Sequence, residues 1–167
     1  DPWYAQSVLL IESPGQLKKS VSGAYGAFQL MPSVARAQGL IVNKTKDERK
    51  YFEKSATAAA KLIKNICIPE AKKILKAHEL QCSENDLWFR FLVLHIYHAG
   101  AGNVAAVLKV INPEEGSQEL IKSMWQNKAA GFGNCSQNYS QLAIASQLIL
   151  HEMVYSNCED VISYSSR

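Results

Sequence analysis

The chain has 167 residues, of which 47% are hydrophobic and 20% are charged, and its formal net charge is +3. Such a composition is typical of a globular protein, and the length fits one domain, 1–167, with a hydrophobic core. It excludes a disordered chain, contains no apolar run long enough to span a membrane, and is too weakly basic to indicate nucleic-acid binding.

The hydrophobic pattern is helical along nearly the whole chain, and no alternating run indicates a β-strand. We therefore predict an all-α fold. In chain order, helices are expected over Pro2–Ile11, Ser33–Gln38, Asp47–Ile66, Pro69–Ala77, Leu87–His98, Val104–Ile111, Ser117–Trp125 and Tyr139–Tyr155. The helix over Leu87–His98 is apolar on most sides, which is typical of a helix at the centre of a domain. The short basic helix over Pro69–Ala77 is expected to be exposed, and segment 127–138 is expected to be a loop.

Glu12 is the first candidate functional residue, because it closes the apolar run 8–11. Hydrophobic surroundings disfavour the charged form of a carboxyl group, so we expect this one to keep its proton near neutral pH. Such an acid can donate its proton to a glycosidic oxygen. A salt bridge or a helix end is the alternative explanation. No motif ties a second carboxylate to Glu12, since Asp47, Glu48 and Asp86 are explained as residues that begin helices.

A glycine-rich motif, Ser-Gly-Ala-Tyr-Gly-Ala-Phe-Gln-Leu-Met-Pro, follows at positions 22–32. Its glycines allow positive φ angles or a close approach of a ligand to the backbone. The amide of Gln29 offers donors and acceptors that suit an N-acetyl group or a hydroxyl. Met31 and Phe28 can form an apolar floor under a sugar. A simple turn between two helices explains the glycines, but it does not explain a glutamine among apolar residues.

These segments resemble the lytic transglycosylases of glycoside hydrolase family 23, and in particular their membrane-bound transglycosylase D branch. The family pattern is Glu-Ser, a short loop, Gly-Ala-x-Gly-x-x-Gln-(Leu/Phe)-Met-Pro and a helix, which matches residues 12–40. Residues 47–62 resemble the next segment of that branch. Residues 96–104 resemble the family's Ala-Tyr-Asn-Ala-Gly-x-Gly-x-Val. Together the matches cover roughly residues 3–145.

The chain departs from the family pattern at three positions that bear on substrate contacts. His98 stands where the family has Asn, and Cys135 and Gln137 stand where the family has Glu and Arg. Tyr139 matches the family's Tyr. The loop between Glu12 and the glycine-rich motif is also about one residue shorter than usual.

The resemblance implies a lysozyme-like fold with a substrate cleft, and cleavage of the bond between N-acetylmuramic acid and N-acetylglucosamine in peptidoglycan. It implies that Glu12 is the single acid and base and that the product is a 1,6-anhydromuramoyl end. Substrate contacts are expected from Ser22, Gln29, Met31, Tyr97, His98 and Tyr139. His98 can donate to a sugar, or it can titrate and change the pH profile.

Further expectations concern partners and location. The partner is the peptidoglycan glycan strand, without nucleic acid, and neither a cofactor nor a metal site is expected. We expect a monomer in the periplasm or cell envelope. No signal peptide is visible at the first residues, so any signal or anchor is expected to lie outside this sequence.

Two other functions stay open. One is a muramidase that adds water, like the goose-type lysozymes. The other is a catalytically impaired domain that binds peptidoglycan without cutting it, which the changes at His98 and at 135–137 would favour.

The four cysteines are Cys67, Cys82, Cys135 and Cys158. An even number in a domain of this size fits an oxidising compartment. Cys67 and Cys82 bracket an apparent insertion relative to the family, 67–82, and the ends of an excursion lie close together. We therefore predict a Cys67–Cys82 disulfide, whereas a pairing of Cys135 with Cys158 stays open.

Overall fold

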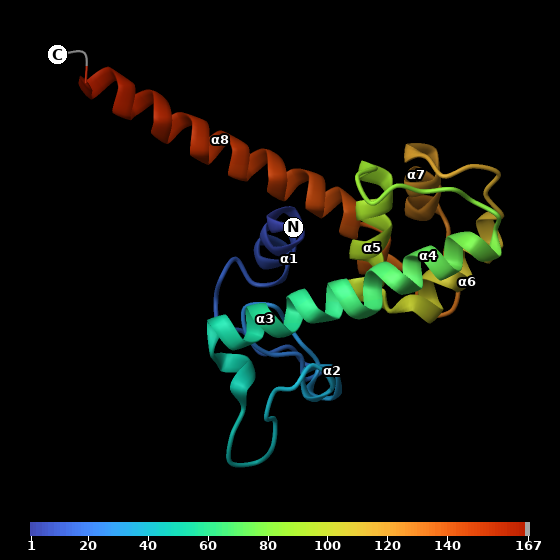
Figure 1. Cartoon of the computed structure of the whole chain (residues 1–167), viewed down its shortest axis with the longest axis horizontal. Coiled ribbons are helices and arrows are strands. Elements are labelled where there is room, and N and C mark those ends of the chain that lie inside the picture. Colours follow the sequence, from blue (N-terminus) through green and yellow to red (C-terminus); the bar gives the residue numbers. More distant parts are fainter. Residues whose placement is uncertain (166–167) are drawn as a thin grey trace.

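The computed structural model describes residues 1–165 and the side chains of residues 1–154. Helices make up 64% of the residues and no strand occurs in this described part, which confirms the all-α prediction. The α-helices are α1 (Pro2–Glu12), α2 (Pro32–Ala37), α3 (Phe52–Leu62), α4 (Ile68–Ala77), α5 (Leu87–Ala99), α6 (Ala101–Ile111), α7 (Gln118–Gln126) and α8 (Tyr139–Ser165) (Figure 1). Two short 3₁₀ helices are η1 (Glu48–Lys50) and η3 (Asn134–Ser136), and η2 (Ile63–Cys67) is a π-helical turn.

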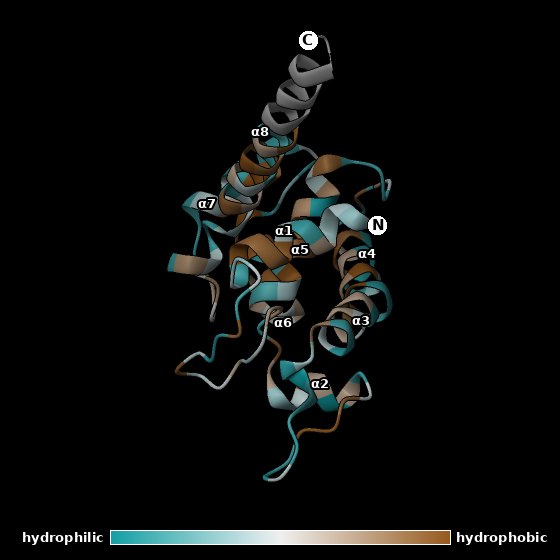
Figure 2. Ribbon diagram, turned by 90° about the vertical axis from the view of Figure 1, so that its left-hand side faces the viewer, coloured by the Kyte–Doolittle hydropathy of each residue, from teal (hydrophilic) through white to brown (hydrophobic). Residues whose placement is uncertain are grey.

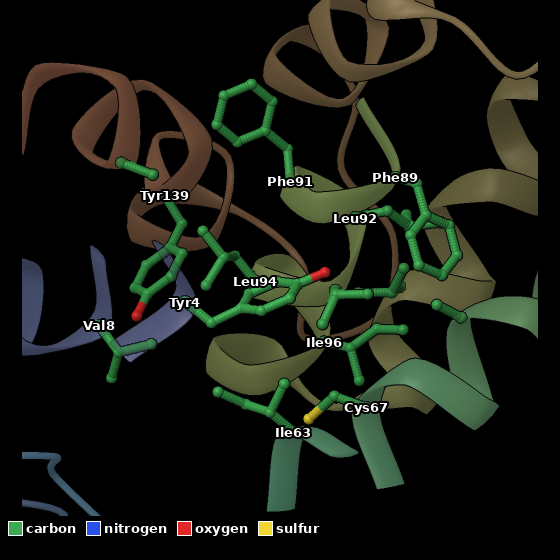
Figure 3. Close-up of a cluster of buried hydrophobic side chains, with 14 of the residues drawn as sticks. Tyr4, Val8, Ile63, Cys67, Phe89, Phe91, Leu92, Leu94, Ile96 and Tyr139 are labelled. Carbon is green, nitrogen blue, oxygen red and sulfur yellow. The ribbon is translucent and has the colours of Figure 1, made fainter. Parts of the chain in front are cut away.

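Helix α5 forms the centre of the fold, as its apolar sequence predicts. It packs against α4, α6, α7 and α8, and Figure 2 shows its hydrophobic residues in the middle of the body. Its buried residues are Trp88, Phe89, Phe91, Leu92, Val93, Leu94, His95 and Ile96. Figure 3 shows Tyr4 and Val8 of α1 beside these side chains. Burial of one such aliphatic side chain contributes roughly 1.5–3 kcal/mol, so α5 rigidly fixes the residues at its C-terminal end.

Helices α1 and α8 pack side by side and run antiparallel. The Gln147 amide donates to Ser7 Oγ at 2.8 Å, while Tyr139 contacts Glu12 at the opposite end of the pair. Helix α8 extends away from the body beyond these contacts (Figure 1) and is longer than the predicted Tyr139–Tyr155. No helix within the described residues combines the length and hydrophobicity that a membrane span requires.

The prediction of a separate, exposed helix at Pro69–Ala77 is wrong. Helices α3 and α4 are continuous through the π-helical turn η2, and α4 buries Ala71, Ile74 and Leu75. Proline lacks an amide hydrogen, and its ring clashes with the carbonyl four residues earlier in an ordinary α-helix. A wider turn immediately before Pro69 moves that carbonyl away, so the helix continues and its apolar side can pack.

The predicted Cys67–Cys82 disulfide is also wrong, because both cysteines are free. The residues between them form α4 rather than a loop that returns to its starting point. Ten helical residues span about 15 Å, whereas a disulfide needs Cα atoms within about 7 Å. Burial raises the pKa of the Cys67 thiol to about 12. Cys135 is free as well. Cys158, the partner that the sequence left open for it, lies outside the residues whose side chains the structure describes.

His95 makes the stability of the fold depend on pH. Its side chain is fully buried, its Nε2 lies 3.0 Å from Ser140 Oγ, and burial lowers its pKa to about 3. An unfolded histidine has a pKa near 6.5, so between about pH 3 and 6.5 the unfolded state binds a proton that the folded state does not. The free energy of unfolding must therefore decrease as the pH falls through this range.

We expect His95→Leu to remove this pH dependence. Between pH 7 and pH 5, the wild type should lose about 2 kcal/mol more of its free energy of unfolding than the variant does. Urea denaturation at both pH values measures the difference, and His78→Leu on the surface is the control. Equal pH dependence in all three proteins would show that His95 is protonated in the folded state.

Candidate active site

Glu12 is the last residue of α1, and the turn that follows is fixed to the fold. Ser13, which ends the helix, is buried, and its hydroxyl donates to the Ala27 carbonyl at 2.8 Å. This bond joins the end of α1 to the glycine-rich segment. The position of Glu12 is therefore set by a rigid helix and by a buried hydrogen bond.

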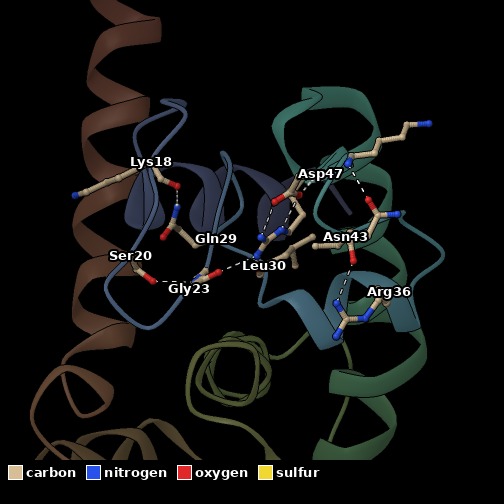
Figure 4. A network of polar contacts seen from close by, with 12 residues as sticks. Lys18, Ser20, Gly23, Gln29, Leu30, Arg36, Asn43 and Asp47 are labelled. Atoms are coloured by element: carbon tan, nitrogen blue, oxygen red, sulfur yellow. Dashed lines mark hydrogen bonds and ion pairs between the residues drawn. The ribbon is translucent and has the colours of Figure 1, made fainter.

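The loop between α1 and α2 is held by its own polar groups. The Gln29 amide nitrogen donates to the Lys18 carbonyl at 2.6 Å (Figure 4). It also donates to the Gly26 carbonyl at 2.8 Å. Gly26 has a φ of +86°, and a Cβ atom there would lie 2.2 Å from the Arg49 carbonyl oxygen. The motif's second glycine is thus needed for close backbone packing, and the amide nitrogen of Gln29 serves the loop itself.

Arg49 fastens the same loop to the helical body. Its guanidinium donates to the Gly23 carbonyl at 2.9 Å and to the Leu30 carbonyl at 2.8 Å (Figure 4). It also forms a two-bond pair with Asp47, at 2.9 and 2.7 Å, and these hydrogen bonds hold the pKa of the Asp47 carboxyl below its usual value. Sequence reasoning missed this role, because it explained Asp47 as a residue that begins a helix.

Tyr139 and His98 converge on one oxygen of Glu12. The Tyr139 hydroxyl donates to Glu12 Oε1 at 2.8 Å, and His98 Nδ1 lies 3.8 Å from the same atom. The His98 and Tyr139 rings are stacked, with centroids 4.4 Å apart. Tyr97 does not reach Glu12, since its hydroxyl donates to the Phe28 carbonyl at 2.7 Å. The contacts from Tyr139 and His98 are both to Oε1, and among the described residues no hydrogen bond occupies Glu12 Oε2.

Burial and the negative charge of Glu12 affect both tyrosines. Burial raises the pKa of Tyr139 and of Tyr97 well above the usual value, and the nearby Glu12 raises each further. Both phenols therefore stay protonated at physiological pH. Tyr139 is thus a permanent hydrogen-bond donor to the Glu12 carboxyl group.

A pocket of about 290 Å³ opens beside Glu12. Its lining comes from α1, the 20–31 loop, α2, α3 and α5, and consists of Glu12, Ser20, Ser22, Ala24, Gln29, Leu30, Met31, Val34, Leu62, Tyr97 and His98. The Glu12 side chain is 17% exposed, so it can contact a ligand and still be largely shielded from water. Among the described residues of this lining, Glu12 is the one carboxylate.

The structure thus brings Glu12 together with the six residues from which substrate contacts were expected. Glu12 and five of these six line the pocket, and Tyr139 supports Glu12 from the core. Their roles toward a substrate stay predictions. Phe28, which the sequence suggested for an apolar floor, is instead buried in the core and does not line this pocket. Leu62, Val34 and Ser20 also line the pocket but carried no sequence signal beyond ordinary helix and turn patterns.

Of the two departures near Tyr139, Gln137 forms hydrogen bonds that hold the segment 127–138 together. The Gln137 amide nitrogen donates to the Trp125 and Asn127 carbonyls at 2.8 and 3.0 Å, and its oxygen accepts from the Asn134 amide. Cys135 is exposed and does not line the pocket. Gln137 therefore stabilises the fold of this segment, in which sequence analysis expected a loop.

A larger hollow of about 450 Å³ lies elsewhere, between α1, α3 and the start of α5. Its two carboxylates are already paired, Asp1 with Arg90 and Glu84 with Lys72. In the described structure, no group of three or more His, Cys, Asp or Glu side chains is gathered as a metal site would need. The pocket at Glu12 is therefore the better candidate for acid–base chemistry.

Comparison with known families gives one match. Residues 4–119 match the family model described as the Transglycosylase SLT domain. This range includes Glu12, the glycine-rich loop and His98. No curated protein and no solved structure matches the chain significantly.

Proposed function

The chain belongs to the Transglycosylase SLT domain family, and from this premise we propose that it cleaves peptidoglycan glycan strands with Glu12 as its single acid and base. Membership indicates a lytic transglycosylase type of activity on peptidoglycan, and a site of action in the cell envelope or periplasm. The observation that carries the finer proposal is the Glu12 carboxyl group, which lines the pocket as the one carboxylate among the described lining residues and has one oxygen held by Tyr139.

A glycosidase that hydrolyses its substrate usually needs two carboxylates, one on each side of the scissile bond. Among the described residues that line this pocket, Glu12 is the one carboxylate. A reaction in which the substrate provides its own nucleophile needs only one carboxylate. This difference favours the transglycosylase reaction over the addition of water by a muramidase.

In the proposed reaction, the Glu12 carboxyl group gives up one proton and later takes one back. Glu12 gives its proton to the bridging O4 oxygen, and the bond from that oxygen to C1 of N-acetylmuramic acid breaks. The C6 hydroxyl of the same sugar then attacks C1 while Glu12 takes up the hydroxyl proton. The products are an N-acetylglucosamine end and a 1,6-anhydromuramoyl end, and no water is consumed. Oε2 is the oxygen that carries the proton, because Oε1 already accepts from Tyr139.

The remaining pocket residues are proposed to position the glycan. Ser22 and His98 present polar groups to the pocket, and Met31, which is 39% exposed, presents an apolar side chain at its edge. Gln29 and Tyr97 shape the pocket from within, because each also bonds a backbone carbonyl of the loop.

Product analysis tests the proposed reaction. Purified protein is incubated with peptidoglycan sacculi, and the released fragments are weighed by mass spectrometry. Anhydromuropeptides are the expected result. Products heavier by one water molecule would identify a muramidase, and binding to the sacculi without any release would identify a domain that holds glycan without cutting it.

Tyr139→Phe should lower kcat by about tenfold with little change in KM. The variant keeps the ring and its stacking on His98, but it loses the hydrogen bond that orients Glu12. A hydrogen bond to a charged group contributes roughly 1.5–3 kcal/mol. In the variant, a water molecule that reaches Glu12 replaces part of this stabilisation, so the loss of rate is smaller than the full value would give. Release of anhydromuropeptides measures the rate, and the exposed Tyr51→Phe is the control. An unchanged kcat would show that Tyr139 does not orient the acid.

A further inference from the structure

His98 lies close enough to Glu12 to act on its charge, but too far away to bond it. The distance from Nδ1 to Glu12 Oε1 is 3.8 Å, and stacking on the buried Tyr139 ring fixes the imidazole in place. A hydrogen bond requires a shorter separation. Coulomb interactions between charges remain effective at this range, particularly away from bulk water. The His98 side chain is 28% exposed, so it can exchange protons with solvent.

Among the described titratable groups around His98, Glu12 is the acidic partner at short range, because the others are held neutral. Tyr139 of α8 and Tyr97 of α5 stay neutral, because burial raises the pKa of both phenols. His95, one turn earlier on α5, also stays neutral, since burial lowers its pKa to about 3. The loop and α3 add uncharged side chains to the same pocket wall, namely Ser20, Ser22 and Leu62.

We propose that His98 is a positioning residue that makes Glu12 a less available acid as the pH falls through the range in which histidine gains a proton. The inference rests on the proposed role of Glu12 as proton donor. It concerns the regulation of that site, and it depends on His98 as a residue of the pocket lining.

The direction of the effect follows from the order in which the two groups bind protons. A histidine is more basic than a glutamic acid, so the first proton taken up by the pair goes to the imidazole. The resulting imidazolium favours the neighbouring carboxylate over its protonated form. Glu12 must be protonated to cleave the glycosidic bond, so the competent fraction of the enzyme decreases.

Two further effects do not reverse this direction. The fraction of Glu12 that is still protonated is a stronger acid beside a positive charge. The rate of proton transfer increases by only a fraction of that gain in acidity. The positive imidazolium also opposes the positive charge that develops on the sugar ring in the transition state. Towards the acidic end of the range from pH 8 to pH 5, the wild type should therefore be slower than a variant without His98.

The test compares pH profiles of the wild type and His98→Asn. Rates of anhydromuropeptide release from purified glycan strands are measured between pH 5 and pH 8, with kcat and KM determined separately. The rate of the variant divided by the rate of the wild type should rise about 3- to 10-fold from pH 8 to pH 5, which is the range expected for a partly exposed charge pair. His78→Asn, at the end of α4 and outside the pocket, should follow the wild type.

Each other outcome overturns the inference in a recognisable way. Parallel profiles for wild type and His98→Asn would show that His98 does not act on Glu12. A higher KM at every pH with an unchanged kcat profile would make His98 a contact to the sugar. Absence of product from both proteins at every pH would overturn the proposed function itself, and the inference with it.

Discussion

Replacing Glu12 with glutamine should lower the rate of glycan cleavage by about 10³-fold or more. General acid–base catalysis contributes roughly 10²–10⁴-fold to an enzymatic rate, and here one group would serve both steps. The pocket lining offers no second carboxylate among the described residues that could take over. Release of anhydromuropeptides from sacculi measures the loss.

The same variant should remain folded, which separates a catalytic role from a structural one. A glutamine oxygen can still accept the hydrogen bond from the Tyr139 hydroxyl. We expect the free energy of unfolding to change by less than about 1 kcal/mol. Glu115→Gln, at an exposed position between α6 and α7, is the matched control for activity. Substantial cleavage by Glu12→Gln would contradict the assignment of Glu12 as the acid.

Replacing Arg49 with methionine should cost about 3–5 kcal/mol of stability. Arg49 is 4% exposed and donates to two carbonyls of the loop as well as to Asp47. Methionine removes these four side-chain hydrogen bonds. The Leu30 carbonyl then keeps only the bond from the Tyr25 amide, and the partly exposed Asp47 keeps only that from the backbone amide of residue 49. Each buried polar group that loses its partner costs roughly 1–3 kcal/mol. Urea denaturation measures the change, and cleavage should decrease as well because the loop carries Ser22 and Gln29.

Arg36→Met provides the comparison for this prediction. Arg36 is exposed and makes one long hydrogen bond, 3.2 Å, to the Val42 carbonyl, so its loss should cost less than about 1 kcal/mol. Arg49→Lys should be intermediate, because lysine retains the charge but cannot form the two-bond pair with Asp47. Equal stability of the Arg49→Met and Arg36→Met proteins would show that the Arg49 contacts do not hold the loop.

The helices were predictable because their signals are local. An amphipathic pattern of helical period appears wherever one side of a helix packs on the core, and α3 and α7 show it clearly, while α5 is apolar on most sides. Predictions from local rules were wrong at Pro69, where a separate helix was expected to begin, and at Cys67, for which a disulfide was expected. Proline usually ends a helix, but the wider turn η2 and the packing of α4 overrode that preference.

The candidate site was predictable at the level of residues but not of contacts. The motif indicated Glu12 and Gln29, and the structure places both in one pocket. It did not indicate that the Gln29 amide nitrogen holds its own loop, or that Tyr97 bonds Phe28 rather than Glu12. Side-chain amides and hydroxyls can serve either a ligand or the backbone, and only the folded geometry distinguishes the two uses.

The sequence by itself determined that the chain is helical, that the helix that is apolar on most sides, α5, is central, and that Glu12 ends the first helix beside a glycine-rich loop. These properties depend on periodicity and on neighbours a few residues apart. Only the tertiary structure decided which groups meet the Glu12 carboxyl. Tyr139 is 127 residues away along the chain, and its hydroxyl reaches Glu12 because α1 and α8 pack antiparallel. Such contacts depend on how whole helices pack around a shared core, which no local pattern specifies.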